Sequence, residues 1–147
     1  MSERARRRVL RAVATATALL VLSACHAAGT PAPAWTEPSD YTYDAAVTVF
    51  GPTAGRWRIT VRGSSVVSAV PLDAEAETAS REGLVEPADF PTLAQLEEWR
   101  AQAESEGADL ARLSRRADGA PVTLELDMSA TAADDDYHLT VSGISTP

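Results

Sequence analysis

Apolar and polar side chains alternate along most of the chain from Tyr41 onward, and this pattern limits the possible folds more than any other feature. In the first such segment the apolar positions are Tyr41, Tyr43, Ala45, Val47 and Val49. A period of two places these side chains on one face of a β-strand and the intervening polar ones on the other. The segment is therefore predicted to form a half-buried strand.

The same alternation predicts five further strands, separated by residues that favour turns. These strands cover residues 56–62, 65–70, 110–116, 122–127 and 137–142. Glycine and proline interrupt the pattern at residues 51–55 and 117–121, and Gly63-Ser64 has the composition of a tight turn. The first three strands are predicted to form an antiparallel meander.

One segment between the two groups of strands has helical periodicity instead. Its apolar side is formed by Leu93, Leu96, Trp99 and Ala103. Thr92 and Gln95 have the spacing of a capping box at its start, and Gly107 is a typical helix stop. The preceding residues, 72–90, are acidic and are expected to form an irregular loop.

These elements predict an α+β fold in two layers. One antiparallel sheet, in the order βββ-α-βββ, would carry a single amphipathic helix on one face. Trp57 and Trp99 are expected to be core residues that meet between sheet and helix. Residues 41–147 are predicted to form a single domain, long enough to bury a core without a disulfide, and Cys25 is the only cysteine.

The first 25 residues have the organisation of a bacterial export signal. Residues 1–11 carry five arginines, and residues 12–22 are an apolar stretch of eleven, about half the length of a membrane-spanning helix. The next residues, Leu22-Ser23-Ala24-Cys25, resemble the lipobox of bacterial lipoproteins. We expect cleavage between Ala24 and Cys25, lipidation of the Cys25 thiol, and attachment to the outer face of the cell membrane.

The expected domains are thus a signal peptide at 1–24, a lipidated cysteine with a proline-rich tether at 25–40, and the folded domain at 41–147. Two or more acyl chains hold a protein stably on a membrane. Arg6-Arg7 also loosely resembles a twin-arginine signal, so both export routes stay open, with the general secretory route favoured.

Charge excludes one class of partner and favours another. From Cys25 onward there are 20 acidic and 8 basic residues, a net charge of −12. Phosphate backbones and anionic lipid headgroups repel such a surface. We expect no nucleic-acid partner, whereas cations and envelope proteins with basic faces remain possible.

The chain offers few groups for catalysis. It contains no lysine, and its one thiol is expected to be acylated. His26 lies in the tether, and His138 lies on the polar face of the last strand, where it is expected to be a surface residue. No catalytic residue, cofactor site or metal site is predicted.

Two charged groups have an alternative interpretation. Asp127 and the run Asp134-Asp135-Asp136 could gather oxygen ligands for Ca²⁺, although the segment lacks EF-hand spacing and a solvated turn is favoured. A basic row on the second strand is expected to pair with the carboxylates of residues 73–89, or alternatively to face a partner. This row is formed by Arg56, Arg58 and Arg62.

Several short motifs, taken in order, resemble an uncharacterised family of small bacterial lipoproteins, mostly from high-GC Gram-positive bacteria. The motifs are Trp35 before Tyr41-x-Tyr43, the hairpin at 58–69, the helix entry at 91–96, the turn and strand at 118–127, and Asp134-Asp135-Asp136-Tyr137. The resemblance implies the family's domain of unknown function and its location, but no activity. Members often carry Cys-x-Cys near the end of the first strand, where this chain has Val49-Phe50-Gly51, so any role of such a pair is absent here.

The expected function is therefore that of a membrane-anchored, non-enzymatic binding or interaction module of the cell envelope. Two alternatives stay open. One is an envelope hydrolase that uses His138 with a nearby carboxylate, and the other is a weak divalent-cation-binding protein.

Overall fold

The computed structural model describes residues 35–132 and 134–147 of the chain. These described residues form six strands, two α-helices and one turn of 3-10 helix. In chain order they are β1 (Asp40–Val49), β2 (Gly55–Arg62), β3 (Ser65–Pro71), α1 (Ala74–Arg81), the 3-10 turn η1 (Pro87–Asp89), α2 (Gln95–Glu106), β4 (Leu110–Arg115), β5 (Pro121–Asp127) and β6 (Asp136–Ser145).

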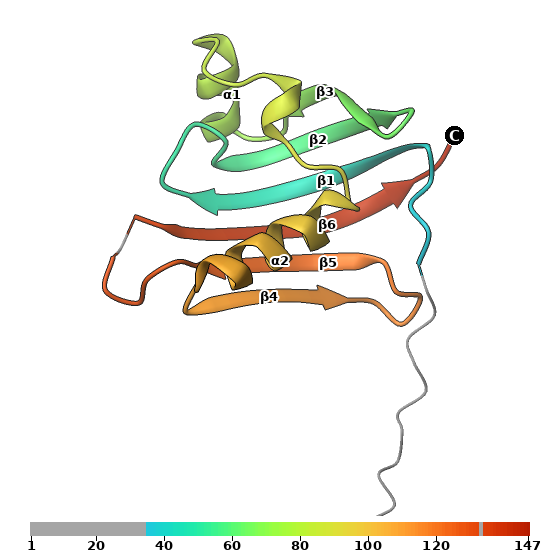
Figure 1. Cartoon of the computed structure of the whole chain (residues 1–147). Helices are drawn as coiled ribbons and strands as arrows, with labels where there is room; N and C mark the ends of the chain where they lie inside the picture. Colours follow the sequence, from blue (N-terminus) through green and yellow to red (C-terminus); the bar gives the residue numbers. More distant parts are fainter. Residues whose placement is uncertain (1–34, 133) are drawn as a thin grey trace, which may run out of the picture. The chain divides into compact units, whose positions relative to one another are not determined.

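All six strands belong to one sheet, in which neighbouring strands are antiparallel and the spatial order is β3-β2-β1-β6-β5-β4 (Figure 1). Two three-stranded meanders are thus joined along β1 and β6. Ala45 pairs with Val141 and Val47 with Leu139 across this junction. The first and last strands of the chain therefore lie in the middle of the sheet.

The expected order βββ-α-βββ with a single helix is wrong, because the middle of the chain contains two helices. Helix α1 and the turn η1 occupy much of the acidic stretch that was expected to be an irregular loop. The Asp73 side chain caps α1 by accepting a hydrogen bond from the Ala76 N–H at 3.0 Å. Glu75 and Glu77 lie in the first turn, where carboxylates interact favourably with the helix dipole.

Helix α1 is held very close to the sheet by a glycine. Ala76 and Ala79 are buried on its inner side, next to the start of β2. A Cβ atom on Gly55 would lie 2.8 Å from the Asp73 carboxylate and 2.9 Å from the Ala76 nitrogen, and Gly55 has a φ of +103°. Only glycine fits both this contact and this backbone conformation.

Helix α2 begins at Gln95, three residues after Thr92, yet Thr92 and Gln95 still form the two hydrogen bonds of a capping box. The Thr92 N–H donates to Gln95 Oε1 at 2.8 Å, and the Gln95 N–H donates to Thr92 Oγ1 at 3.4 Å. The predicted stop is confirmed, because Gly107 caps the helix with a φ of +87°.

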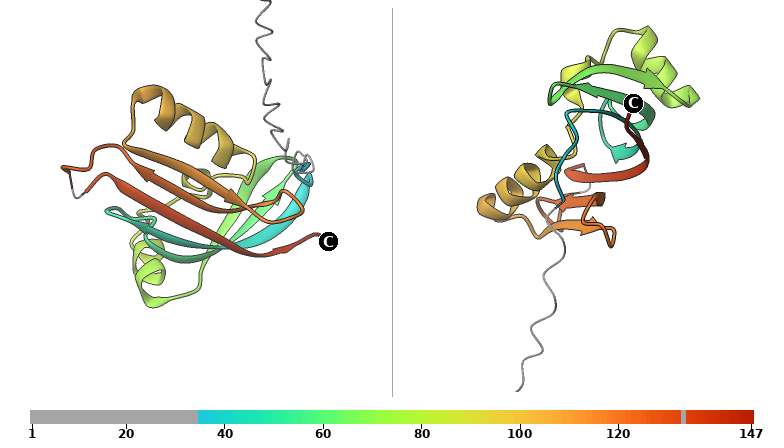
Figure 2. Two further views of the ribbon diagram at one scale, coloured as in Figure 1. Left: turned by 90° about the horizontal axis from the view of Figure 1, so that it is seen from below. Right: turned by 90° about the vertical axis from the view of Figure 1, so that its right-hand side faces the viewer.

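One face of the sheet, which we call the inner face, forms the core with the helices (Figure 2). Trp57 is fully buried and lies against Phe90, with ring centroids 4.9 Å apart. Trp99 of α2 is partly buried and meets Tyr137 of β6 edge to face at 5.8 Å. Trp57 and Trp99 thus both belong to one continuous core, but each packs its ring against a different aromatic residue.

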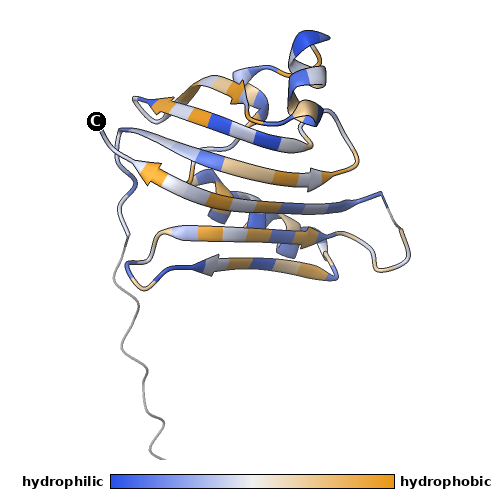
Figure 3. Cartoon of the chain, turned by 180° about the vertical axis from the view of Figure 1, so that it is seen from behind, coloured by the Kyte–Doolittle hydropathy of each residue, from blue (hydrophilic) through white to orange (hydrophobic). Residues whose placement is uncertain are grey.

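Hydrophilic and hydrophobic residues alternate along the strands (Figure 3), and the burial patterns of β1 and β2 place the polar side chains on the opposite face, which we call the outer face. Neither of the described helices lies in front of the central strands when the sheet is seen from this side. The pairing register places Asp44, Arg58 and Ser142 side by side on this face, and likewise Thr48, His138 and Glu125. Because these side chains remain hydrated, the face needs no second layer to cover it.

Candidate functional site

The two ends of the sheet differ in chemistry. We call the near end the one at which the chain enters β1; the β2–β3 turn, the β4–β5 turn and the C-terminus lie there too. The far end contains the β1–β2 loop, the start of α1, the α2–β4 connection and the β5–β6 loop. This division follows directly from the antiparallel register.

At the near end the residues preceding β1 are bound to the domain. Glu37 accepts hydrogen bonds from the Tyr41 hydroxyl and, at 2.9 Å, from the Ala94 N–H. The Tyr41 hydroxyl in turn accepts a bond from the Leu93 N–H at 2.8 Å. Burial, together with the neighbouring Glu37 carboxylate, raises the pKa of Tyr41 well above its usual range, so the hydroxyl keeps its proton.

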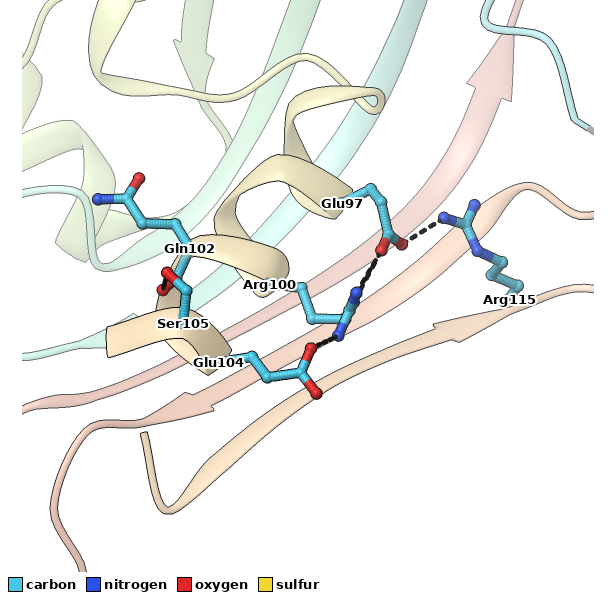
Figure 4. Close-up of polar contacts among 6 residues, drawn as sticks. All are labelled: Glu97, Arg100, Gln102, Glu104, Ser105 and Arg115. Carbon is cyan, nitrogen blue, oxygen red and sulfur yellow. Dashed lines mark hydrogen bonds and ion pairs between the residues drawn. The ribbon is translucent and has the colours of Figure 1, made fainter. Parts of the chain in front are cut away.

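Charges along α2 and at the near end of β4 are arranged in opposite pairs (Figure 4). Arg100 contacts Glu97 and Glu104 of the same helix at 2.7 Å each, and Arg115 of β4 contacts Glu97 at 2.8 Å. Partial burial alone would raise the pKa of Glu97, but hydrogen bonds from Arg100 and Arg115 outweigh this effect and lower it. A further pair, Arg116 with Asp118, lies in the β4–β5 turn with its atoms 2.6 Å apart.

The basic row on β2 is paired within the sheet. Arg58 makes two hydrogen bonds to Asp44, at 2.8 and 3.0 Å, and Arg62 lies 3.7 Å from Asp40. The expected pairing with residues 73–89 is therefore wrong for these two arginines, because β1, not α1, runs beside them on the outer face. Arg56 does meet this region, but through its backbone N–H, which donates to Asp73.

His138 lies on the outer face, as its strand pattern predicted, and its side chain is 44% exposed. Its Nε2 lies 3.2 Å from Thr140 Oγ1 and its Nδ1 lies 3.8 Å from Glu125 Oε1. The first distance is within hydrogen-bonding range and the second is longer than a hydrogen bond. A hydroxyl, an imidazole and a carboxylate are thus neighbours on an exposed surface.

The far end collects carboxylates. They come from the region of α1, from the end of α2 and its connection to β4, and from the β5–β6 loop with its flanking strands. They are Asp73, Glu75, Glu77, Glu82, Glu106, Asp109, Asp127, Asp134, Asp135 and Asp136. Within residues 35–132 and 134–147, no ion pair joins any of them to an arginine.

Three of these carboxylates face one another. Oxygens of Asp127, Asp135 and Asp136 lie within 4.8 Å of each other, whereas Asp134 does not join the group. The Oδ1 atoms of Asp127 and Asp135 are buried without a hydrogen-bond partner in the described residues. Burial raises the pKa of Asp127, and the charges of Asp136, Asp135 and Asp109 raise it further, against a backbone hydrogen bond that lowers it.

This cluster provides carboxylate oxygens, which Ca²⁺ prefers, but Ca²⁺ requires six to eight oxygen ligands. Three carboxylates provide half of that set at most if each binds through one oxygen. Calcium binding by these residues therefore stays a prediction of weak affinity.

Among the hollows at the far end of the described residues, two have mainly apolar walls. The larger of these two, of about 320 Å³, lies between the β1–β2 loop and α1, and its wall includes Pro52, Ala79 and Leu84 together with the carboxylates Glu75 and Glu82. The smaller, of about 240 Å³, lies between α2 and the end of β5, beside Trp99. Both are at or below the lower limit of small-molecule pockets, so they suit single side chains better than a whole ligand.

Comparison with known proteins identifies the family. The model of a family of unknown function, DUF6174, matches residues 34–146. The chain belongs to DUF6174. This confirms the expected membership of an uncharacterised family, and the DUF6174 match begins within the stretch that was assigned to the tether. No curated protein and no solved structure matches the chain.

The expected anchor lies outside the part of this DUF6174 protein that the structure describes. Ala24, Cys25 and His26 all precede residue 35. In the described residues, none of the helices has both the length and the apolar character required to cross a membrane.

Sequence reasoning missed the neighbours of several site residues in this DUF6174 domain. Glu37 lay in the presumed tether, and Glu125 became relevant only through the register of β5 and β6. Thr140 could have been found from the sequence, because it follows His138 by two residues on the same strand. A signal for α1 was present, because Asp73 occupies a favourable N-cap position before an alanine-rich segment.

Proposed function

We propose that this chain is a lipoprotein held by Cys25 at the outer face of the cell membrane, whose domain binds a basic envelope partner through the far end of the sheet. Binding would involve no chemical change of the partner. The observation that carries the binding proposal is the contrast between paired charges at the near end and unpaired carboxylates at the far end.

The anchor is supported by the sequence around Cys25 and by the position of the domain's first bound residues. Trp35 packs against the core, and Glu37 is hydrogen-bonded to α2. The ten residue steps from Cys25 to Trp35 span at most about 35 Å. A lipid on Cys25 would therefore keep the near end within this distance of the bilayer.

The far end supports the choice of partner. Neighbouring carboxylates without cations repel each other and disfavour the folded state. In the cluster of Asp127, Asp135 and Asp136 no ion pair of the described residues offsets this cost, and local costs of this kind are expected at functional surfaces. The combined field of the far-end carboxylates repels anionic headgroups and attracts basic proteins, raising the association rate at low ionic strength.

Two measurements test these claims separately. Labelling cells with a palmitate analogue should mark the wild-type protein, whereas Cys25→Ala should abolish the label and cleavage at this site. Continued labelling of the Cys25→Ala variant would refute the anchor.

For binding, chemical crosslinking in intact cells, followed by mass spectrometry, should recover a reproducible basic envelope protein. Neutralising the β5–β6 loop with Asp134→Asn, Asp135→Asn and Asp136→Asn should reduce that yield several-fold. An unchanged yield, or no reproducible partner, would contradict the proposal.

A second function, hydrolysis, is favoured by one specific observation, the contact of His138 with Thr140 and Glu125. In a nucleophilic triad the imidazole takes the hydroxyl proton and the carboxylate orients the imidazole. Here the imidazole and the hydroxyl are two positions apart on a hydrated strand, and the carboxylate is beyond hydrogen-bond range. If His138→Ala fully complements a deletion strain, hydrolysis by this group is excluded; a loss of function that His138→Gln does not restore would favour it.

A further inference from the structure

We infer that the hollow between α1 and the β1–β2 loop receives an apolar side chain of the partner that is flanked by arginine or lysine. This inference rests on the proposed function and assigns the contact to one place at the far end. The hollow is formed by Gly51, Pro52, Ala54, Thr78, Ala79 and Leu84, with Glu75 and Glu82 at its edge.

Apolar side chains in and beside the hollow are exposed to water. Leu84 is 54% exposed and Phe50, next to the hollow in sequence, is 85% exposed. Each exposes apolar surface to water, and covering it would be favourable at roughly 25 cal/mol per Å². Contiguous exposed apolar surface marks interaction sites, and Leu84 contributes such surface within the wall of the hollow itself, beside Pro52, Ala54 and Ala79.

Helix α1 and the residue that follows it contribute two carboxylates to the same hollow. Glu75 and Glu82 both contribute to the wall of the hollow, and neither has an ion pair in the described residues. A partner segment that placed a basic side chain beside its apolar one would satisfy both features at once. A second copy of this chain would instead bring its own carboxylates toward them, which like-charge repulsion disfavours.

The backbone around the hollow is suited to a preformed site. The Trp57 indole N–H donates to the Thr53 carbonyl at 2.9 Å, which ties the β1–β2 loop to the core. Gly55 and Asp73 fix the first turn of α1 against the sheet. Both walls are thus positioned before binding, which reduces the entropy lost on association.

The test uses the full chain purified from membranes in detergent micelles. The probe is a synthetic ten-residue peptide with a central leucine between two arginines, labelled with a fluorophore for anisotropy. Two matched peptides replace the arginines by glutamates or the leucine by serine. Only the first peptide should bind saturably, with an affinity that falls as salt is added.

The affinity of the basic peptide for four variants of the chain tests whether it binds in the hollow. Leu84→Ser should weaken binding about tenfold, as for a residue at the centre of a contact, and Glu82→Gln about threefold, as for a charge at its edge. Val67→Ser, at a valine that is 52% exposed on β3, and Glu98→Gln, on the exposed side of α2, are the matched controls and should leave the affinity unchanged.

Three outcomes would overturn the inference: equal binding of the acidic peptide, equal binding by Leu84→Ser, or no binding of the basic peptide at millimolar concentration. Sedimentation of the full chain as a dimer that Leu84→Ser dissociates would assign the hollow to a second copy instead, and this also refutes it. The proposed function would survive such failures if far-end crosslinks to a basic envelope protein were still obtained in cells.

Discussion

The near and far ends of the sheet are built from the same strands, yet the charged groups at the two ends have different neighbours. At the near end Glu37 accepts two hydrogen bonds, and Arg100 and Arg115 both contact Glu97. Among the described residues, Asp127 and Asp135 at the far end each bury an oxygen without a hydrogen-bond partner, next to Asp136. The near end thus pairs opposite charges, whereas this cluster at the far end places like charges together.

This difference separates residues that specify the fold from residues available for recognition. Satisfied polar groups stabilise the folded state and fix the position of the chain entering β1. Unsatisfied carboxylates lower stability and extend a negative field into solvent. The comparison therefore predicts that substitutions at the near end destabilise the protein, and that charge removal from the cluster of Asp127, Asp135 and Asp136 does the reverse.

The largest expected effect is at the near end. Tyr41→Phe removes a hydroxyl that bonds both Glu37 and the Leu93 N–H, which leaves the Leu93 N–H without a partner and Glu37 with one of its two hydrogen bonds. The free energy of unfolding should fall by about 1–3 kcal/mol, measured by urea denaturation at neutral pH. Tyr137→Phe is the control, because its hydroxyl has no hydrogen bond among the described residues, and it should change stability by less than about 0.5 kcal/mol. Equal losses in the two variants would contradict the role of Glu37.

At the far end, removing a charged group should stabilise the protein instead of destabilising it. The pKa of Asp127 is raised in the folded state, so its carboxylate destabilises the protein above that pKa, and the penalty disappears below the ordinary aspartate range near pH 4. Asp127→Asn should therefore raise the Tm at pH 7 and leave it unchanged at about pH 3. Thermal unfolding at both pH values checks this, and a lower Tm at pH 7 would show that the carboxylate is stabilising.

A smaller effect is expected from the paired charges of α2. The pKa of Glu97 is lowered in the folded state, so its stabilisation is present above the ordinary glutamate pKa and is lost as the pH falls through the lowered value. Because the Glu97 side chain is 45% exposed, Glu97→Gln should cost only about 0.5 kcal/mol at pH 7. Denaturation at pH 7 and about pH 2 should show this difference shrinking to zero, while Glu98→Gln changes stability at neither pH.

The smallest effect is expected from calcium. Three carboxylates supply too few ligands for tight binding, so calorimetry with the full chain should show no saturable heat below about 1 mM Ca²⁺. Saturable binding at micromolar Ca²⁺, lost in Asp127→Asn, would mean that the far end is a cation site. The proposal of a basic protein partner would then lose its main support.

The sequence predicted the six strands because each one shows the alternation of its two faces directly. It did not predict that β1 pairs with β6, because local periodicity does not determine which strands are neighbours. Helix α1 was missed because its buried residues are the small Ala76 and Ala79, which give little apolar periodicity between the glutamates.

For the candidate site, too, the sequence predicted what depends on one segment and missed what depends on the pairing of segments. Placement of His138 and Thr140 on the outer face could be predicted from their own strand, but the approach of His138 to Glu125 depends on register. Likewise the aspartate run was visible in the sequence, whereas the pairing of β5 with β6 brings Asp127 opposite Asp136. Contacts between distant segments are set by tertiary structure, which the pattern of one segment does not contain.

Site-specific photo-crosslinking in intact cells tests the central claim most directly. A photoreactive residue replaces Phe50 at the far end or Ala117 in the β4–β5 turn at the near end, two exposed positions on the same lipidated protein. The account predicts that Phe50 yields a reproducible crosslink to a basic envelope protein and that Ala117 does not. A protein crosslink from Ala117 alone, or equal yields from both positions, would contradict it.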